Sequence, residues 1–101
     1  MDIFNLENLV NYQGGVIVSR EILKNSGGAI TVFAFGAGQK LSEHTAPFDA
    51  LAYVIDGEAE IIVSGESHKL KRGDYIIMPS SEPHSVNALS NFKMVLVMLK
   101  K

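Results

Sequence analysis

The sequence has no cysteine and no tryptophan, and only 3 prolines among its 101 residues. The absence of cysteine excludes disulfide bonds, zinc sites built on thiolates and thiol catalysis, and it agrees with a reducing compartment. The first residues, Met1 to Asn5, lack a basic start followed by an apolar run, so we expect a cytoplasmic protein without a signal peptide. The apolar runs are far shorter than the about 20 residues that span a membrane, and no membrane partner is expected.

The chain also lacks a large excess of charge of either sign. Its 9 basic and 11 acidic side chains give a formal net charge of −2, and no basic block stands out. Nucleic-acid binding needs a clustered positive surface, so we expect no nucleic-acid partner. Apolar residues make up 47% of the chain, which is enough for one core, and we expect a single domain over residues 1–101.

Period-two patterning interrupted by turn residues runs along the chain, and no window has helical spacing longer than a turn or two. Asp56-Gly57 predicts a hairpin between two strands, and Gly65-Glu66 predicts the next turn. Many short strands separated by Gly, Asp and Pro predict an all-β sandwich or barrel. The strands are expected over residues 29–37, 51–55, 58–64, 67–70, 74–78, 84–88 and 92–99.

Two of these segments, 29–37 and 92–99, are apolar on both faces. A barrel strand turns one face inward, so its other face must be covered by something else. One candidate cover is the N-terminal segment, residues 1–12, whose apolar side chains would form a lid; these are Leu6, Leu9 and Val10. The other candidate is a second copy of the chain, and we favour a homodimer because twofold oligomers are the commonest assembly.

Two segments carry an ordered pattern of glycine, proline and histidine. Residues 38–57 read GQKLSEHTAPFDALAYVIDG, and residues 73–88 read GDYIIMPSSEPHSVNA. The residues at fixed spacings are Gly38, His44 and Gly57 in the first segment, and Gly73, Pro79 and His84 in the second. In order, and on a β-only pattern, the two segments resemble the two conserved motifs of the cupin superfamily, with Ser81 in place of a motif glycine.

The resemblance covers most of the chain and is to the small, single-domain bacterial cupins with a type 2 conserved barrel. It implies a jelly-roll barrel, the double-stranded β-helix of RmlC-like cupins, made of two sheets around a cavity that opens at one end. Gly57 and Gly73 would then stand at tight turns, where glycine adopts a positive φ at low cost.

In metal-binding cupins the two motifs supply three histidines and a carboxylate. The matching positions here are His44, Ala46, Ala50 and His84, so two of the four side chains cannot bind a metal. A catalytic metal needs about three protein ligands, and a divalent Fe, Mn, Ni or Zn ion would require a further ligand here. Asp49 is the better candidate if a bulge at Pro47-Phe48 turns it inward. The remaining candidates are Glu43 and Gln39, and the alternative role for Asp49 is to cap nearby backbone amides.

Without these two ligands the cavity becomes larger and more apolar. The side chains expected to line it, besides His44 and His84, are Phe35, Tyr53, Met78 and Met94, with Phe33 and Met98 as further candidates. Such a pocket suits a small, partly apolar molecule that is oriented by two imidazoles. For at least half of the aromatic and methionine set, ordinary barrel core is the simpler explanation.

The sequence leaves two functions open, and whether the chain is an enzyme stays undecided. The first is a stand-alone cupin that binds a small organic molecule, with His44 and His84 as polar anchors. The second is a metal-dependent cupin enzyme, such as a dioxygenase, isomerase or decarboxylase, that uses both histidines and a non-standard third ligand. A metal-free enzyme similar to sugar epimerases ranks last, because Arg20 and Arg72 lie outside the motifs.

Overall fold

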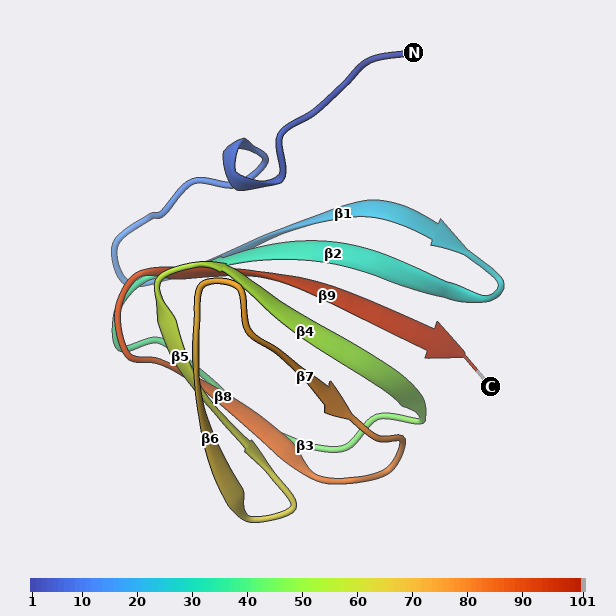
Figure 1. Ribbon diagram of the computed structural model, residues 1–101, viewed down its shortest axis with the longest axis vertical. Coiled ribbons are helices and arrows are strands. Elements are labelled where there is room, and N and C mark those ends of the chain that lie inside the picture. Colours follow the sequence, from blue (N-terminus) through green and yellow to red (C-terminus); the bar gives the residue numbers. More distant parts are fainter. Residues whose placement is uncertain (101) are drawn as a thin grey trace.

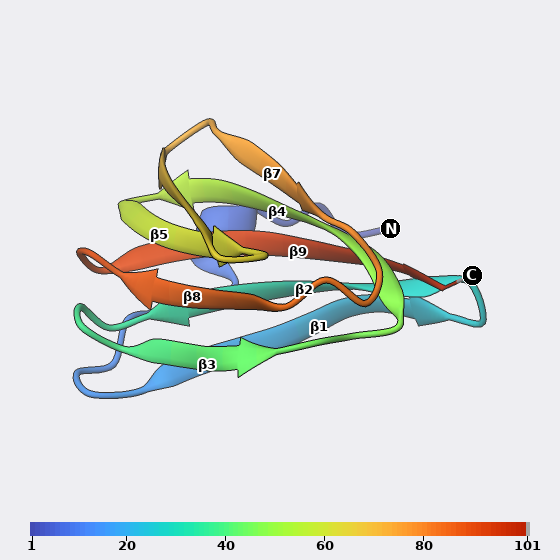
Figure 2. The same ribbon diagram turned by 90° about the horizontal axis from the view of Figure 1, so that it is seen from below.

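The computed structural model describes residues 1–100 and is almost entirely β-structure, built from nine strands within that range. Two antiparallel sheets face each other, one in the order β1-β2-β9-β4-β7 and the other in the order β3-β8-β5-β6 (Figures 1 and 2). The strands are β1 (Ile17–Asn25), β2 (Gly28–Phe35), β3 (Lys40–His44), β4 (Phe48–Asp56), β5 (Glu58–Val63), β6 (Glu66–Lys71), β7 (Tyr75–Met78), β8 (His84–Ala88) and β9 (Phe92–Lys100). A 3₁₀ turn, η1 (Leu6–Asn8), precedes them. The predicted all-β jelly roll is therefore confirmed.

The turn at Asp56-Gly57 differs from the expected hairpin. β4 pairs with β7 and β9, whereas β5 lies in the other sheet and pairs with β6 and β8. Gly57 has a φ of +73°, and a Cβ there would lie 1.9 Å from the carbonyl oxygen of Asn91. The chain therefore crosses from one sheet to the other through a corner that admits only glycine, and the hairpin prediction is wrong.

A tight hairpin does join β5 to β6. Its two central residues, Ser64 and Gly65, have φ angles of +50° and +79°. Positive φ at both positions is the pattern of the tight turn whose twist matches that of paired antiparallel strands. The turn expected near Gly65 is thus present, displaced by one residue from the predicted pair.

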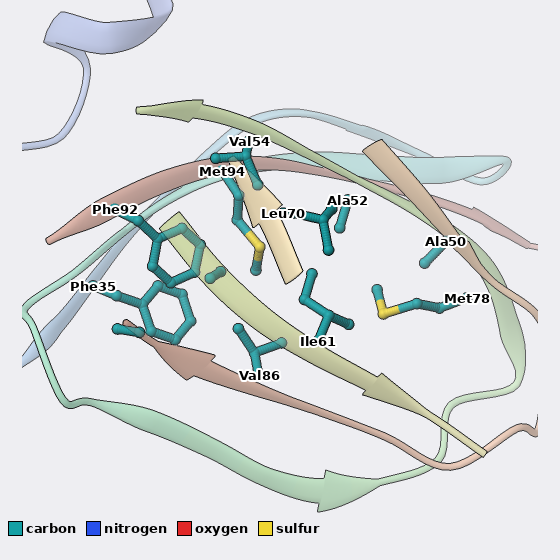
Figure 3. Packing of buried hydrophobic residues seen from close by; sticks show 12 residues of the cluster. Phe35, Ala50, Ala52, Val54, Ile61, Leu70, Met78, Val86, Phe92 and Met94 are labelled. Carbon is teal, nitrogen blue, oxygen red and sulfur yellow. The ribbon is translucent and has the colours of Figure 1, made fainter. Parts of the chain in front are cut away.

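The core lies between the two sheets, and its largest side chains gather at one end of the barrel. The rings of Phe35 and Phe92 are both fully buried and stack with centroids 4.5 Å apart. Figure 3 shows this pair at one end of the core, with Ala50 and Met78 at the other. We call these the packed end and the open end. The aliphatic side chains of Val54, Ile61, Leu70 and Val86 fill the space between them.

The outer face of the five-stranded sheet is covered at the packed end by the N-terminal segment. Val10 is only 3% exposed and packs with Val32, Ile55 and Val95. The Tyr12 hydroxyl donates a hydrogen bond to Asp56 Oδ2 at 2.5 Å, which fixes the segment to the end of β4. Burial and this hydrogen bond raise the pKa of Tyr12. Leu9 joins the same cluster, whereas Leu6 remains 39% exposed, so the lid consists of two of the three predicted side chains.

No helix among residues 1–100 is long and apolar enough to cross a membrane.

Candidate ligand site at the open end of the barrel

The two motif histidines lie side by side on neighbouring strands. β3 and β8 pair antiparallel with His44 directly opposite His84, after an irregularity that begins beyond Leu41. The ring centroids are 4.3 Å apart in an edge-to-face arrangement. His84 shares the inward face of β8 with Val86 and is 8% exposed, whereas His44 is exposed. The sequence pattern therefore brings its two predicted anchors together at one end of the barrel.

The loop that leads into His84 is held in a strained conformation. Ser81, which stands at the motif's glycine position, has a φ of +66°, in the left-handed region that disfavours side chains. Its backbone N–H donates to the carbonyl of Ala46 at 2.8 Å, and that of Ser64 donates to the carbonyl of Pro83 at 2.8 Å. The side chains of Ser64 and Glu82 are also hydrogen-bonded. Strain of this kind persists where the surrounding structure overdetermines it, and it collects at functional sites.

Each imidazole uses the same ring nitrogen, Nδ1, to contact the backbone carbonyl two residues earlier in the chain. Nδ1 of His44 lies 2.8 Å from the carbonyl oxygen of Ser42, and Nδ1 of His84 lies 3.2 Å from that of Glu82. A carbonyl oxygen only accepts, so Nδ1 carries the proton in both rings. In the neutral tautomer Nε2 then presents a lone pair, and no other group within residues 1–100 forms a hydrogen bond to either Nε2.

Burial disfavours the charged form of His84. Desolvation and, to a smaller extent, the nearby His44 ring lower its pKa, against the effect of the hydrogen bond to the Glu82 carbonyl. The ring is therefore neutral near pH 7. At that pH it offers a hydrogen-bond acceptor to a ligand.

A cavity of about 210 Å³ opens at the same end, on the inner face of the five-stranded sheet. Its walls include Glu21 and Lys24 from β1, Ala29 from β2, Phe48 from β4, and Met98 and Lys100 from β9. On this side β1, β2 and β9 extend beyond the ends of β3 and β8 (Figure 2). Residues 45–47 connect His44 directly to Phe48, which places the histidine pair and the cavity at one end.

The comparison with protein families agrees with this architecture. Residues 31–100 match the family model described as the cupin domain. The chain belongs to the cupin family. A conserved protein of unknown function from Streptococcus pyogenes has the same fold with a TM-score of 0.94 and 31% identity, over 99% of this chain and 88% of that one. A cupin superfamily protein from Desulfitobacterium hafniense gives a TM-score of 0.91 at 24% identity, over 95% and 88% of the two chains.

Two further relatives are similar along nearly the whole cupin chain. A cupin 2 conserved barrel domain protein from Leptotrichia buccalis is 39% identical with a TM-score of 0.93, over 96% of this chain and 47% of that one. An uncharacterized protein from Aquifex aeolicus is 28% identical over 97 residues, which is 94% of this chain and 80% of that one.

The residues present do not fit the metal that many cupins hold. Asp49 lies in regular pairing with Leu99, on the outer face of β4, so the bulge that would turn it inward is absent. Its Oδ1 instead accepts a hydrogen bond from the Ser80 N–H at 2.9 Å, which is the capping alternative. No group of three His, Cys, Asp or Glu side chains within residues 1–100 is arranged to bind a metal ion. Two imidazoles fall short of the about three ligands that a catalytic metal needs.

The expected cavity lining is partly core and partly outer surface. Phe35 and Met94 are 0% and 1% exposed and belong to the packed interior, so they do not line an open cavity. Met78 is 2% exposed and lies at the open end, opposite Ala50. Tyr53 was expected to line the cavity, and this prediction is wrong. It alternates with the buried Ala52 and Val54, so it points outward from β4 and is 38% exposed.

Sequence reasoning missed the charged lining of the 210 Å³ cavity, namely Glu21, Lys24 and Lys100. Lys100 continues the inward face of β9 that Met94 and Met98 define, so strand alternation could have identified it. Lys24 could not be placed in this way, because the register of β1 shifts between Glu21 and Leu23.

Proposed function

We propose that this cupin binds a small organic molecule at the open end of its barrel, with His44 and His84 as polar anchors. The observation that carries the proposal is the histidine pair itself, with rings 4.3 Å apart and both Nδ1 atoms engaged by backbone carbonyls. Both Nε2 lone pairs are then available to accept a hydrogen bond. A hydroxyl or amide N–H is the ligand group that such acceptors bind.

The open end also provides apolar surface for the rest of the ligand. Two inward-facing side chains that are only partly buried, Val63 and Met98, pack against the core there. Ligand sites combine such surface with a few polar groups that fix orientation. A strained loop behind His84 keeps its ring in position at the cost of stability, as is common at binding sites.

The test is a ligand screen against a paired variant. Untagged protein and a His44→Gln, His84→Gln double variant are compared by thermal shift against small alcohols, phenols, sugars and acids. We expect at least one class to raise the melting temperature of the parent and not of the variant. Elemental mass spectrometry is run in parallel on both proteins.

Two results would overturn the proposal. In the first, compounds that stabilise the parent stabilise the variant equally. In the second, the parent holds about one metal ion per chain that the variant loses, which would establish the metal-dependent enzyme instead.

A homodimer through the outer face of the five-stranded sheet is the second part of this proposal. One row of directly paired apolar side chains crosses all five strands there: Leu23, Ile30, Val97, Leu51 and Ile77. We call it the outer row. Leu23 is 59% exposed and Ile77 50% exposed, beyond the reach of the N-terminal lid. A continuous apolar surface of this kind marks an interaction site.

The outer row suits a second copy of the same surface. Hollows of about 280 Å³ and 190 Å³ lie on the two sides of Val97 and Leu99, and Leu99 itself protrudes at 58% exposure. A face with both hollows and protruding side chains can pack against a second copy related by a twofold axis, because the protruding side chains of each copy can enter the hollows of the other. The residues of the outer row carry no charge, so no like-charge contact opposes the pairing.

Sedimentation equilibrium of two lysine variants tests the dimer. Ile77→Lys places a charge in the outer row and is expected to give a monomer. Leu89→Lys changes a residue of equal exposure, 50%, outside the row, and should leave a dimer. A parent that is monomeric at 100 μM, or an Ile77→Lys variant that stays dimeric, would contradict the proposed interface.

A further inference from the structure

The cavity of about 210 Å³ at the open end has both apolar and charged walls. Its floor is apolar: Ala29 and Met98 are directly paired on β2 and β9, and Phe48 comes from the neighbouring β4. Lysine side chains stand on two sides of this floor. Lys24 pairs with Ala29 across the β1–β2 ladder, and Lys100 pairs with Phe48 across the β9–β4 ladder.

Space between the two lysines is provided by β2. The strand contributes only Gly28 and Ala29 to the cavity wall, so none of its side chains there is larger than a methyl group. Gly28 cannot be enlarged, because a Cβ would lie 2.0 Å from the carbonyl oxygen of Met98. The Lys100 N–H donates to the carbonyl of Gly27 at 2.9 Å, which holds the end of β9 against this turn. Small residues on β2 and a turn held by backbone contacts therefore leave room for the cavity.

Within the described residues, neither lysine ammonium group forms an ion pair with a carboxylate. Among residues 1–100 the ion pairs involve Glu7, Glu58 and Glu66, and neither Lys24 nor Lys100 takes part in one. The single carboxylate in the wall is Glu21, also outside these ion pairs, so two positive charges and one negative charge leave the cavity at +1. Unpaired cations beside an apolar floor are the complement of a small organic anion.

From this arrangement we infer that the cavity binds the carboxylate of a small organic acid. Lys24 and Lys100 bind the carboxylate, and Phe48 and Met98 contact the apolar part of the molecule. The volume lies below the roughly 300–1,000 Å³ of pockets for drug-sized ligands, which limits the ligand to a small acid. This inference rests on the proposed function, since it specifies the class of molecule that enters the open end.

Titration of ¹⁵N-labelled protein with benzoate tests the inference, with benzamide as the neutral analogue. Benzoate is expected to shift the amide signals of Ala29, Met98 and Lys100 saturably, and benzamide to bind at least about five-fold more weakly. A Lys24→Gln, Lys100→Gln double variant should lose at least about five-fold in benzoate affinity. Glu21→Gln removes the repelling carboxylate and should bind benzoate about two-fold or more tightly.

The matched control is Lys69→Gln, Lys71→Gln, which removes the same charge from β6 at a distance from the cavity. It should bind benzoate like the parent. Equal affinity for benzoate and benzamide, an unaffected Lys24 and Lys100 variant, or no saturable shift at 50 mM benzoate would each overturn the inference.

The histidine double variant separates this inference from the proposed function. Loss of benzoate binding in the lysine variant alone supports the acid site and contradicts the role of His44 and His84 as anchors of that ligand. If benzoate binding is instead lost in the histidine variant and unchanged in the lysine variant, the result supports His44 and His84 as anchors and contradicts the acid site at Lys24 and Lys100.

Discussion

The two ends of the barrel differ in the size and polarity of their side chains. At the packed end, Phe35 and Phe92 are fully buried and stacked, and the N-terminal lid covers the sheet behind them. At the open end, the corresponding inner positions hold Ala50 and the half-buried Met98, and the polar groups are histidine and lysine. The large buried side chains at the packed end provide most of the packing energy. The open end can therefore contain a cavity and a strained loop.

The sharpest way to test this division is to remove one phenylalanine from each end. Phe92→Ala is expected to lower the free energy of unfolding by about 3–5 kcal/mol, because it leaves a cavity beside Phe35. Phe48→Ala removes a half-buried ring at the open end and should cost about 1 kcal/mol. Urea unfolding measures both variants. Equal losses for the two rings would contradict a stability gradient along the barrel.

Glycine corners allow a second comparison. Gly57→Ala forces a methyl group against the backbone of Asn91 at the packed end, and we expect a loss of about 2–4 kcal/mol. Gly65 has a similar φ, +79°, but a methyl group added there would meet no atom within 4 Å, so Gly65→Ala should cost only about 1–2 kcal/mol. Thermal unfolding of both variants measures the difference. If Gly65→Ala lowers the free energy of unfolding as much as Gly57→Ala, the positive φ alone determines the loss and the contact with Asn91 adds nothing.

The smallest expected effect concerns protonation at the open end. Because the pKa of His84 is lowered below 6.5 in the folded protein, the unfolded chain binds this proton more readily. The contribution of His84 to the free energy of unfolding should therefore be complete above pH 6.5. As the pH falls below 6.5, this contribution should decrease. Urea unfolding at pH 7.5 and 5.5 measures the decrease, which His84→Gln should reduce. His68→Gln, on the surface, is the control, and an equal reduction in both variants would exclude His84 as the source.

The fold was largely predictable from patterns, because most strands have one buried face. The segment 84–88 alternates buried and half-buried residues and was predicted with its observed bounds. β1 and β3 were missed because nearly all of their side chains are exposed, so no alternation marks them. The Asp56-Gly57 pair was misassigned because the same dipeptide serves a hairpin and a corner, and only the approach of Asn91 distinguishes them.

The site was predictable to the extent that it depends on motif spacing. His44 and His84 were identified because two glycine-anchored motifs fix their positions, and the structure places them opposite each other. The orientations of Asp49 and Tyr53 were not accessible, because a shift of one residue moves a strand side chain to the other face. Of the two cavity lysines, Lys100 follows the alternation of β9, whereas the register shift in β1 between Glu21 and Leu23 hides the orientation of Lys24.

The position of β9 has a consequence for how the chain acquires its structure. This strand joins β2 to β4 in the middle of the five-stranded sheet, yet it follows every other strand in the chain. During synthesis the halves of that sheet cannot be connected until β9 has emerged from the ribosome. Its pairing of Phe92 with Phe35 and of Leu99 with Gly28 spans most of the chain, and such non-local pairing slows folding. Nascent chains should therefore expose the inner faces of β2 and β4 and depend on chaperones until β9 has been made.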